Sequence, residues 1–440
     1  MAGGGGEVVP GPPRPQAAAR GGGRPRKRQT PSLPLDIVLE IAARTDPATL
    51  VRCASTCGDM RGRVADPAFR RRLRLRHAAD RFVPSLLRGH LEVRYLSDYR
   101  SVALHLVDIT GAGDTTTARL PTAADGFPPH PDGKTAGRQH QPLASRDGLL
   151  LVRTTDWQPP HDELRVCDPA TGRSQALPPE PTFPGAAQKN WDPYVLLVGD
   201  GGAAVDGVRP FQVLKVNLVM SGHHCYLEIQ TFSSEDVAWG SYAEIRTPHL
   251  HGSSLLRRVT PLVADGAVYW LCVTKSAAYV LNLHISTAQV TVTTLPVSFP
   301  CSDKGIDYLL ATATAGGGEL MVLVADGKKN NICAWAQTRK PTMMAKWKQR
   351  PQVVVESEAM LRFRNARWSA TFHVYLHWFA ERSGLVLFSC GIDGEFWLDL
   401  RSMEIVRWFP GSPDLYRSTE CLPYEMDLAS WVPTFSSTII

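Results

Sequence analysis

The sequence predicts an α+β multidomain chain, in which a small module of three helices precedes a mostly β domain. Residues 33–77 show helical periodicity, whereas the region beyond residue 147 consists of short apolar runs bounded by turn residues. Glycine-led strand pairs also recur there with a loose spacing of about sixty residues. The 440 residues suffice for two or three domains, and a hydrophobic content of 43% supports a substantial core.

The first thirty residues form a predicted disordered basic tail. Residues 1–30 consist mainly of Gly, Pro, Ala and Arg and contain almost nothing to bury. Within them, the run GRPRKR carries closely spaced cations that include Lys27 and Arg28. The run is compatible with a nuclear-import signal and equally with a solubilising extension.

The charge of the chain is distributed unevenly. The net charge is +6, but residues 1–100 hold 19 Lys and Arg against 9 Asp and Glu. The remaining residues hold 29 against 33, so the large C-terminal region is mildly acidic. Because phosphate binding needs clustered cations, this balance argues against nucleic acid as a main partner.

Three helix-start signals lie close together in the helical module. Pro34 stands in the opening turn of the first helix, and Asp46-Pro47 and Asp66-Pro67 each pair an N-cap residue with a proline at the first helical position. A unit of this size has little core of its own, so it needs a partner or an attached domain. Apolar faces follow the first two starts at helical spacing: Leu35, Val38, Leu39 and Ala42, then Leu50, Cys53, Ala54 and Cys57.

Residues 31–80 resemble an F-box. The family pattern begins with Leu-Pro and continues through an aliphatic helix, a Leu-x-x-Cys element, a second Cys and a closing Asp-Pro-x-Phe. Met60 departs from the pattern, because the family usually carries Trp before the basic residue, here Arg61. The other reading is a helical hairpin that caps a larger domain. The matching elements are Leu33-Pro34, Ile37 to Ile41, Leu50 to Cys53, Cys57, and Asp66 to Phe69.

The resemblance implies that the module docks on the Skp-type adaptor of a cullin–RING ubiquitin ligase. The chain would then be a non-catalytic substrate receptor that needs no cofactor, and its β domain would hold a target protein. Proximity to the ligase would raise the effective concentration of target lysines. The resemblance places Cys57 and Met60 in the small core or at its edge, and both are included among the predicted docking residues. The residues expected to face the adaptor are Leu33, Pro34, Ile37, Ile41, Leu50 and Val51.

Residues 95–440 are predicted to form a β-rich domain, with a strand at 100–109 and a long Gly/Thr/Pro-rich loop at 111–146. All eleven tryptophans lie at or beyond Trp157, as expected where large rigid side chains fill the space between sheets. Asp-Gly pairs that begin at 147, 200, 206, 265, 326 and 393 predict hairpin turns. The predicted strands include 149–152, 194–198, 211–216, 226–232, 267–273, 278–283, 320–324, 385–389 and 396–400.

The repeat in the β domain favours a propeller over a β-sandwich. Gly148, Gly266, Gly318 and Gly384 lead comparable strand pairs, and the first interval is close to two repeats. The region is also similar to the kelch-like associated domains that follow the F-box in plant F-box proteins. The sequence alone does not predict the number of blades.

No catalytic motif stands out. The cluster His223-His224-Cys225 lies in a predicted turn without a second ligand pair, so we expect an exposed loop there and no metal site. His373 and His377 share a face of a predicted strand and are expected to be a half-buried pair. Cys53 and Cys57 lie on one helical face, where packing is expected and a disulfide is not.

The cell compartment is constrained only broadly. Nine cysteines without a CxxC pair indicate reduced thiols of the cytoplasm or nucleus. No secretory signal or membrane-spanning run is visible. Two rival functions stay open: an F-box protein that acts without a ligase, for example in regulating transcription, and a sugar-binding protein or enzyme built on the β domain.

Overall fold

The computed structural model describes most of the chain between residues 33 and 426. The basic tail therefore lies outside the described residues, and so do Asp46-Pro47 and Val51. The described residues are 33–42, 50, 53–54, 57–66, 68–69, 82–83, 86–95, 102–108, 116–119, 138–157, 160–169, 173–184, 194–199, 209–220, 225–248, 250, 255, 259–302, 304–314, 319–338, 346–362, 373–390, 394–410 and 421–426.

The helical module contains α1 (Leu35–Ala42) and α3 (Gly58–Ala65), with further helical residues at 50, 53–54 and 68–69. The carbonyl of Pro34 accepts the N–H groups of Ile37 and Val38 at 3.0 and 3.1 Å, so α1 begins where the sequence indicates. Asp66 Oδ1 accepts the N–H of Ala68 at 2.8 Å, as an N-cap does. α3 was not predicted as a separate helix, because its two glycines and the lack of an apolar stripe hide it.

The module has a small core of its own, to which α1, α3 and the intervening helical residues contribute. Cys53 and Cys57 pack against this core as free thiols, in agreement with the prediction. Its buried members are Leu39, Ala42, Leu50, Ala54, Met60, Val64, Phe69 and Leu86.

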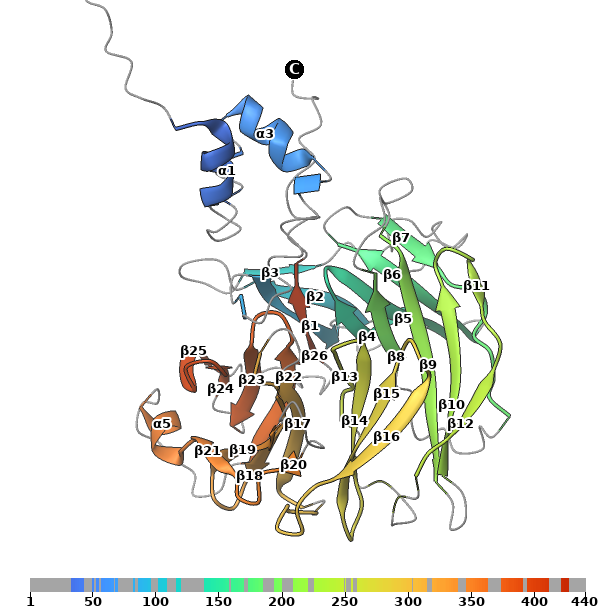
Figure 1. The fold of residues 1–440 in the computed structure, drawn as a ribbon, viewed down its shortest axis with the longest axis vertical. Helices are drawn as coiled ribbons and strands as arrows, with labels where there is room; N and C mark the ends of the chain where they lie inside the picture. Colours follow the sequence, from blue (N-terminus) through green and yellow to red (C-terminus); the bar gives the residue numbers. More distant parts are fainter. Residues whose placement is uncertain are drawn as a thin grey trace, which may run out of the picture.

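The β region is a propeller, and its described strands form six blades (Figure 1). Neighbouring strands within each blade are antiparallel, and a single parallel pair, Val102 with Gln139, connects the first two blades into one sheet. From the innermost strand outward, blade 1 contains β26 (Cys421–Glu425), β1 (Leu87–Tyr95), β2 (Val102–Asp108) and β3 (Thr116–Arg119). Blade 2 contains β4 (Arg138–Arg146), β5 (Leu149–Trp157), β6 (Pro160–Asp168) and β7 (Arg173–Ala176).

Blades 3 and 4 follow in chain order. Blade 3 contains β8 (Tyr194–Val198), β9 (Phe211–Met220), β10 (Cys225–Ser233), β11 (Ala238–Trp239) and β12 (Ala243–Arg246). Blade 4 contains β13 (Leu262–Ala264), β14 (Ala267–Val273), β15 (Ala278–His284) and β16 (Gln289–Thr294).

Blades 5 and 6 complete the set. Blade 5 contains β17 (Ile306–Thr312), β18 (Leu320–Asp326), β19 (Asn331–Thr338), β20 (Lys346–Trp347) and β21 (Gln352–Val355), followed by the short helix α5 (Ser357–Leu361). Blade 6 contains β22 (Val374–Ala380), β23 (Leu385–Cys390), β24 (Gly394–Asp399) and β25 (Glu404–Pro410).

The last strand that the structure describes completes the first blade. β26 pairs with β1, with Leu91 opposite Leu422 and Glu92 opposite Cys421. The N–H of Met426 also donates to the carbonyl of Leu86 at 2.9 Å. A ring that is closed by its two chain ends excludes the β-sandwich alternative and confirms the propeller prediction.

The turns and strands predicted from the sequence match most of the hairpins near the centre of the ring, but some strands of blades 1 and 2 were not predicted. Asp147-Gly148 and Asp265-Gly266 have positive φ at both positions, as the predicted two-residue turns require. The predicted strand at 100–109 corresponds to β2. The predicted loop at 111–146 was wrong in part, because β3 and β4 lie within it; β4 is largely polar and carries Pro142, which concealed it.

Large apolar side chains fill the space between neighbouring blades. The most buried include Trp270 and Trp378, which are 0% and 1% exposed, in agreement with the predicted role of tryptophan in the β domain.

In the part of the chain that the structure describes, no helix is long and apolar enough to cross a membrane.

Candidate interaction site

The helix α1 presents two different faces. Leu39 and Ala42 are buried in the core of the module, at 6% and 4% exposure. Leu33, Ile37 and Ile41 are 59%, 47% and 51% exposed, although all three are large and apolar. Their spacing of four residues aligns them along one side of the helix and of the turn that precedes it. This exposed apolar stripe is available to a partner.

The other predicted docking residues occupy different places. Pro34 is exposed beside the apolar stripe, whereas Leu50 and Met60 are only 2% and 3% exposed. The prediction that Leu50 faces the adaptor is wrong for this structure, because Leu50 is buried in the same small core as Leu39 and Ala42 of α1. Met60 lies in the small core and Cys57 is half-buried against it, as the resemblance implied. Val51 lies outside the described residues.

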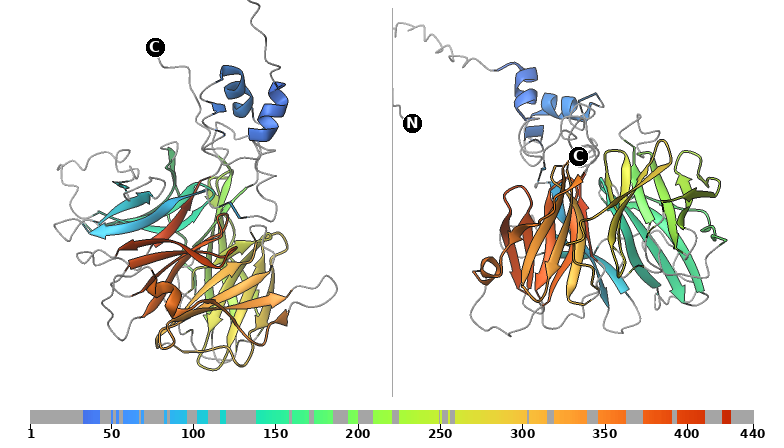
Figure 2. Two further views of the ribbon diagram at one scale, coloured as in Figure 1. Left: turned by 90° about the vertical axis from the view of Figure 1, so that its left-hand side faces the viewer. Right: turned by 60° about the horizontal axis from the view of Figure 1, so that its bottom comes forward.

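A short segment joins the module to the propeller. The Phe82 ring is buried in the propeller core and meets Phe379 edge to face, with 6.1 Å between ring centroids. The next residue, Val83, packs on the module core, and its N–H donates to the carbonyl of Arg382 at 2.8 Å. Leu86 belongs to the module core and Leu87 to β1. The module is therefore attached to the ring by packing as well as by the chain. Figure 2 shows α1 and α3 on one side of the propeller.

The β22–β23 turn, residues 381–384, carries this attachment. Gly384 has φ +71°, and a β-carbon at this position would overlap the Phe82 ring. Only glycine therefore combines this backbone conformation with the close approach of an aromatic ring.

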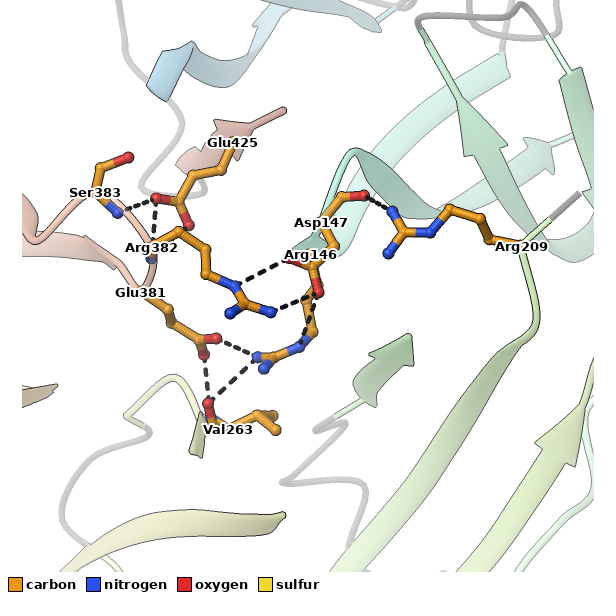
Figure 3. A network of polar contacts seen from close by, with 8 residues as sticks. All are labelled: Arg146, Asp147, Arg209, Val263, Glu381, Arg382, Ser383 and Glu425. Atoms are coloured by element: carbon orange, nitrogen blue, oxygen red, sulfur yellow. Dashed lines mark hydrogen bonds and ion pairs between the residues drawn. The ribbon is translucent and has the colours of Figure 1, made fainter. Parts of the chain in front are cut away.

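A polar network surrounds the same turn at the centre of the ring (Figure 3). Arg382 donates from Nε and Nη2 to the two carboxylate oxygens of Asp147, at 3.1 and 3.3 Å. Arg146 pairs with Glu381, and Glu381 also accepts the N–H of Val263 at 3.0 Å. Because these residues belong to the β4–β5 turn, to β13 and to the β22–β23 turn, the network connects blades 2, 4 and 6.

The carboxyl group of Asp147 is strongly stabilised in its ionised form. Burial alone would raise its pKa, but the guanidinium groups of Arg382, Arg146 and Arg209 outweigh burial and hold the pKa below its usual value. Arg209 also donates to the Asp147 carbonyl at 2.6 Å, which brings blade 3 into the network.

Glu425, in the closing strand, has a different environment. Its carboxylate accepts the N–H groups of Arg382 at 3.1 Å and of Ser383 at 2.6 Å. Burial, with a smaller contribution from the nearby Glu381 carboxylate, raises the pKa of Glu425 to about 7, although hydrogen bonds from Ser383 and from the Arg382 backbone oppose this rise. Glu425 therefore titrates near neutral pH.

A cavity of about 300 Å³ opens beside this network, at the end of the inner strands where the module is attached. Its charged lining consists of Arg146, Arg382, Asp147, Glu381 and Asp265. Both signs of charge therefore line the cavity, with three carboxylates against two arginines. A smaller cavity of about 80 Å³ continues toward Trp378 between the inner strands.

The polar candidates from the sequence do not form a site. Cys225 is buried at the start of β10, and His223-His224 lies outside the described residues. His377 is half-buried and contacts Ser389 at 2.7 Å, whereas His373 is exposed just before β22. Within the described ranges, no three His, Cys, Asp or Glu side chains gather as a metal ion would require.

The central network was not predicted, because its members are far apart in sequence and Asp147 signals only a turn.

Solved structures with a broadly similar arrangement share 11–12% sequence identity with this chain. One is TolB from Acinetobacter baumannii, at 11% identity and a TM-score of 0.37, covering 76% of this chain and 65% of that chain. A chain of a mitotic checkpoint complex (11%, TM-score 0.28) covers 62% of this chain and 64% of its own. A chain from a study of two prolyl endopeptidases (12%, TM-score 0.30) covers 63% and 37%.

Less than two thirds of each of those chains is covered, and the scores are low, so the propeller assignment depends on the strand order alone. No curated protein matches the sequence. The helical module lies outside the residues that a family model matches. That model is described as a domain of unknown function, DUF7595, and because it matches residues 134–436, well over half of the chain, the protein belongs to this family.

Proposed function

We propose that the protein is the substrate-recognition subunit of a Skp–cullin–F-box ubiquitin ligase. In this proposal, the apolar stripe of Leu33, Ile37 and Ile41 binds the Skp-type adaptor, and the propeller binds a target protein. The protein performs no chemistry itself and acts by bringing the target close to the ligase. We place it in the cytoplasm, the nucleus or both.

The exposed stripe on α1 is the observation that carries the proposal. A helix that already buries Leu39 and Ala42 in its own core has no structural need for three large apolar side chains on its other side. Such an apolar face is typical of a helix that docks on a partner. The resemblance to the F-box places the adaptor-facing residues at these same positions.

The attachment of the module to the ring supports the receptor role. Phe82 is buried in the propeller and Val83 is bonded to the β22–β23 turn. A target on the propeller would consequently be held at a defined distance from the ligase, which favours transfer to a limited set of lysines.

Adaptor binding tests the proposal. Ile37→Asp places a charge in the stripe without disturbing the core, because Ile37 is exposed. Burying an isoleucine contributes about 1.5–3 kcal/mol. We therefore expect at least about a tenfold loss of affinity for the purified Skp-type adaptor, and a similar loss for Leu33→Ala combined with Pro34→Ala.

Val406→Asp is the matched control, since Val406 is 52% exposed on β25 in the propeller. It should keep full adaptor binding. Full binding by Ile37→Asp would contradict the proposed docking face. Co-purification of cullin with the wild-type protein separates a ligase subunit from an F-box protein that acts alone.

A further inference from the structure

We propose that Glu425 is a proton-sensitive latch, which holds both the closing strand and the helical module on the β22–β23 turn. This inference is independent of adaptor binding, because it concerns contacts within the chain.

Three separate parts of the chain meet at the β22–β23 turn. The N–H groups of Arg382 and Ser383 donate to the Glu425 side chain on β26, while the carbonyl of Arg382 accepts from Val83 in the joining segment. The Phe82 ring covers Gly384 in the same turn. Displacement of Glu425 would therefore loosen the ring closure and the module attachment together.

The charged surroundings of Glu425 make its carboxylate sensitive to protonation. In the β22–β23 turn, Glu381 is a second carboxylate, and the Arg382 side chain turns away toward Asp147 (Figure 3). From the β4–β5 turn, Arg146 lies near but pairs with Glu381.

The remaining neighbours of Glu425 do not neutralise it. On β1, its cross-strand partner is the apolar Leu87, which is followed by Arg88, and Tyr424 precedes Glu425 on β26. Among the described residues, Glu425 forms no ion pair with a cation. Hydrogen bonds from Ser383 and from the backbone N–H of Arg382, together with a weaker attraction to the Arg382 guanidinium, offset its buried negative charge only in part. Such a group binds a proton more readily when the latch is closed than when water reaches it.

The sign of the pH effect follows from linkage. Because the closed form has a pKa of about 7 and the opened form has the ordinary value of 4.5, the closed form binds more protons between them. The latch is therefore tightest below the ordinary value and loosens as the pH rises through about 7. Between about pH 6 and about pH 8, the equilibrium constant for opening should rise about tenfold.

Hydrogen exchange of the intact protein measures this opening. We expect exchange of the amides of Val83, Ser383 and Met426, corrected for the pH dependence of the intrinsic rate, to accelerate about tenfold over that range. In Glu425→Gln, which is uncharged and of the same shape, protection should be at least as high as in the wild type at about pH 8, and independent of pH.

Asp399→Asn is the matched control, because Asp399 is also a buried carboxyl in blade 6 but caps the turn after β24. This variant should keep the wild-type pH dependence at the latch. The proposal would be overturned if the latch amides of the wild type exchanged at equal rates at about pH 6 and about pH 8, after correction for the intrinsic rate. So would a Glu425→Gln variant that exchanges faster than the wild type at both pH values or keeps its pH response.

Discussion

Removal of the closing strand should unfold far more than one strand. β26 forms five cross-strand pairs with β1. Tyr424 in this strand and Met426 directly after it are buried in a core that blades 1 and 2 share. With about 1 kcal/mol net for the hydrogen bonding of each of the five pairs and about 1.5–3 kcal/mol for each of the two buried side chains, removal of these residues costs about 8–11 kcal/mol. This loss is comparable to the total stability of a typical domain, about 5–15 kcal/mol. We expect a chain that ends at residue 420 to lose cooperative folding.

Two truncations provide the assay. A chain that ends at residue 426 keeps β26 and should melt like the full-length protein in calorimetry and circular dichroism. A chain that ends at residue 420 should aggregate or melt without a sharp transition, because the edge of β1 is then uncovered and β22 loses its packing against β26. A cooperative transition near the full-length Tm in the shorter chain would refute the view that the six blades depend on closure.

Three further predictions concern the centre of the ring and the attachment of the module. Phe82→Ala should lower stability by about 3–5 kcal/mol, and protease should then cleave more readily between module and propeller; unchanged cleavage would show that the module is held by other contacts. Gly384→Ala should cost at least about 1–2 kcal/mol at φ +71°, measured by urea unfolding. Because the pKa of Asp147 is lowered in the folded protein, ionised Asp147 stabilises the fold above the ordinary value of 3.8, and stability should fall as the pH drops below that value. Asp147→Asn should abolish this part of the acid sensitivity. An unchanged acid profile in this variant would contradict the role of the arginine partners.

The β domain could be predicted from sequence where local signals agree. Strands such as β14 and β23 are short apolar runs beside Asp-Gly or Gly-led turns, so composition and turn chemistry point to the same structure. β4 was missed because its residues are mainly polar, and its role as an inner strand depends on neighbours from other blades. The pairing of β26 with β1 could not be predicted, because it connects opposite ends of the domain.

The apolar stripe on α1 and the network around Arg382 also differ in how far they could be predicted from the sequence. Leu33, Ile37 and Ile41, the exposed stripe on α1, could be named in advance because the resemblance to the F-box implied them. Helical spacing by itself marked the face that contains Leu39 and Ala42, which the module buries. The resemblance assigned Leu50 to the adaptor, whereas helical spacing grouped it with Ala54, and the structure buries both in the core of the module. The network around Arg382 is assembled from distant turns, and no local pattern marks its members.

The pairing of the first and last strands also has a consequence during synthesis. β1 begins at residue 87, but its partner β26 begins only at residue 421. At a translation rate of about 5–20 residues per second, the ribosome needs about 20 to 70 s to pass from one to the other. Throughout that interval one edge of β1, including the backbone of Leu91, has no partner within the nascent chain, and any strand of a neighbouring polypeptide could pair with it. Production in cells should therefore depend on chaperones that cover this edge until the last residues leave the ribosome.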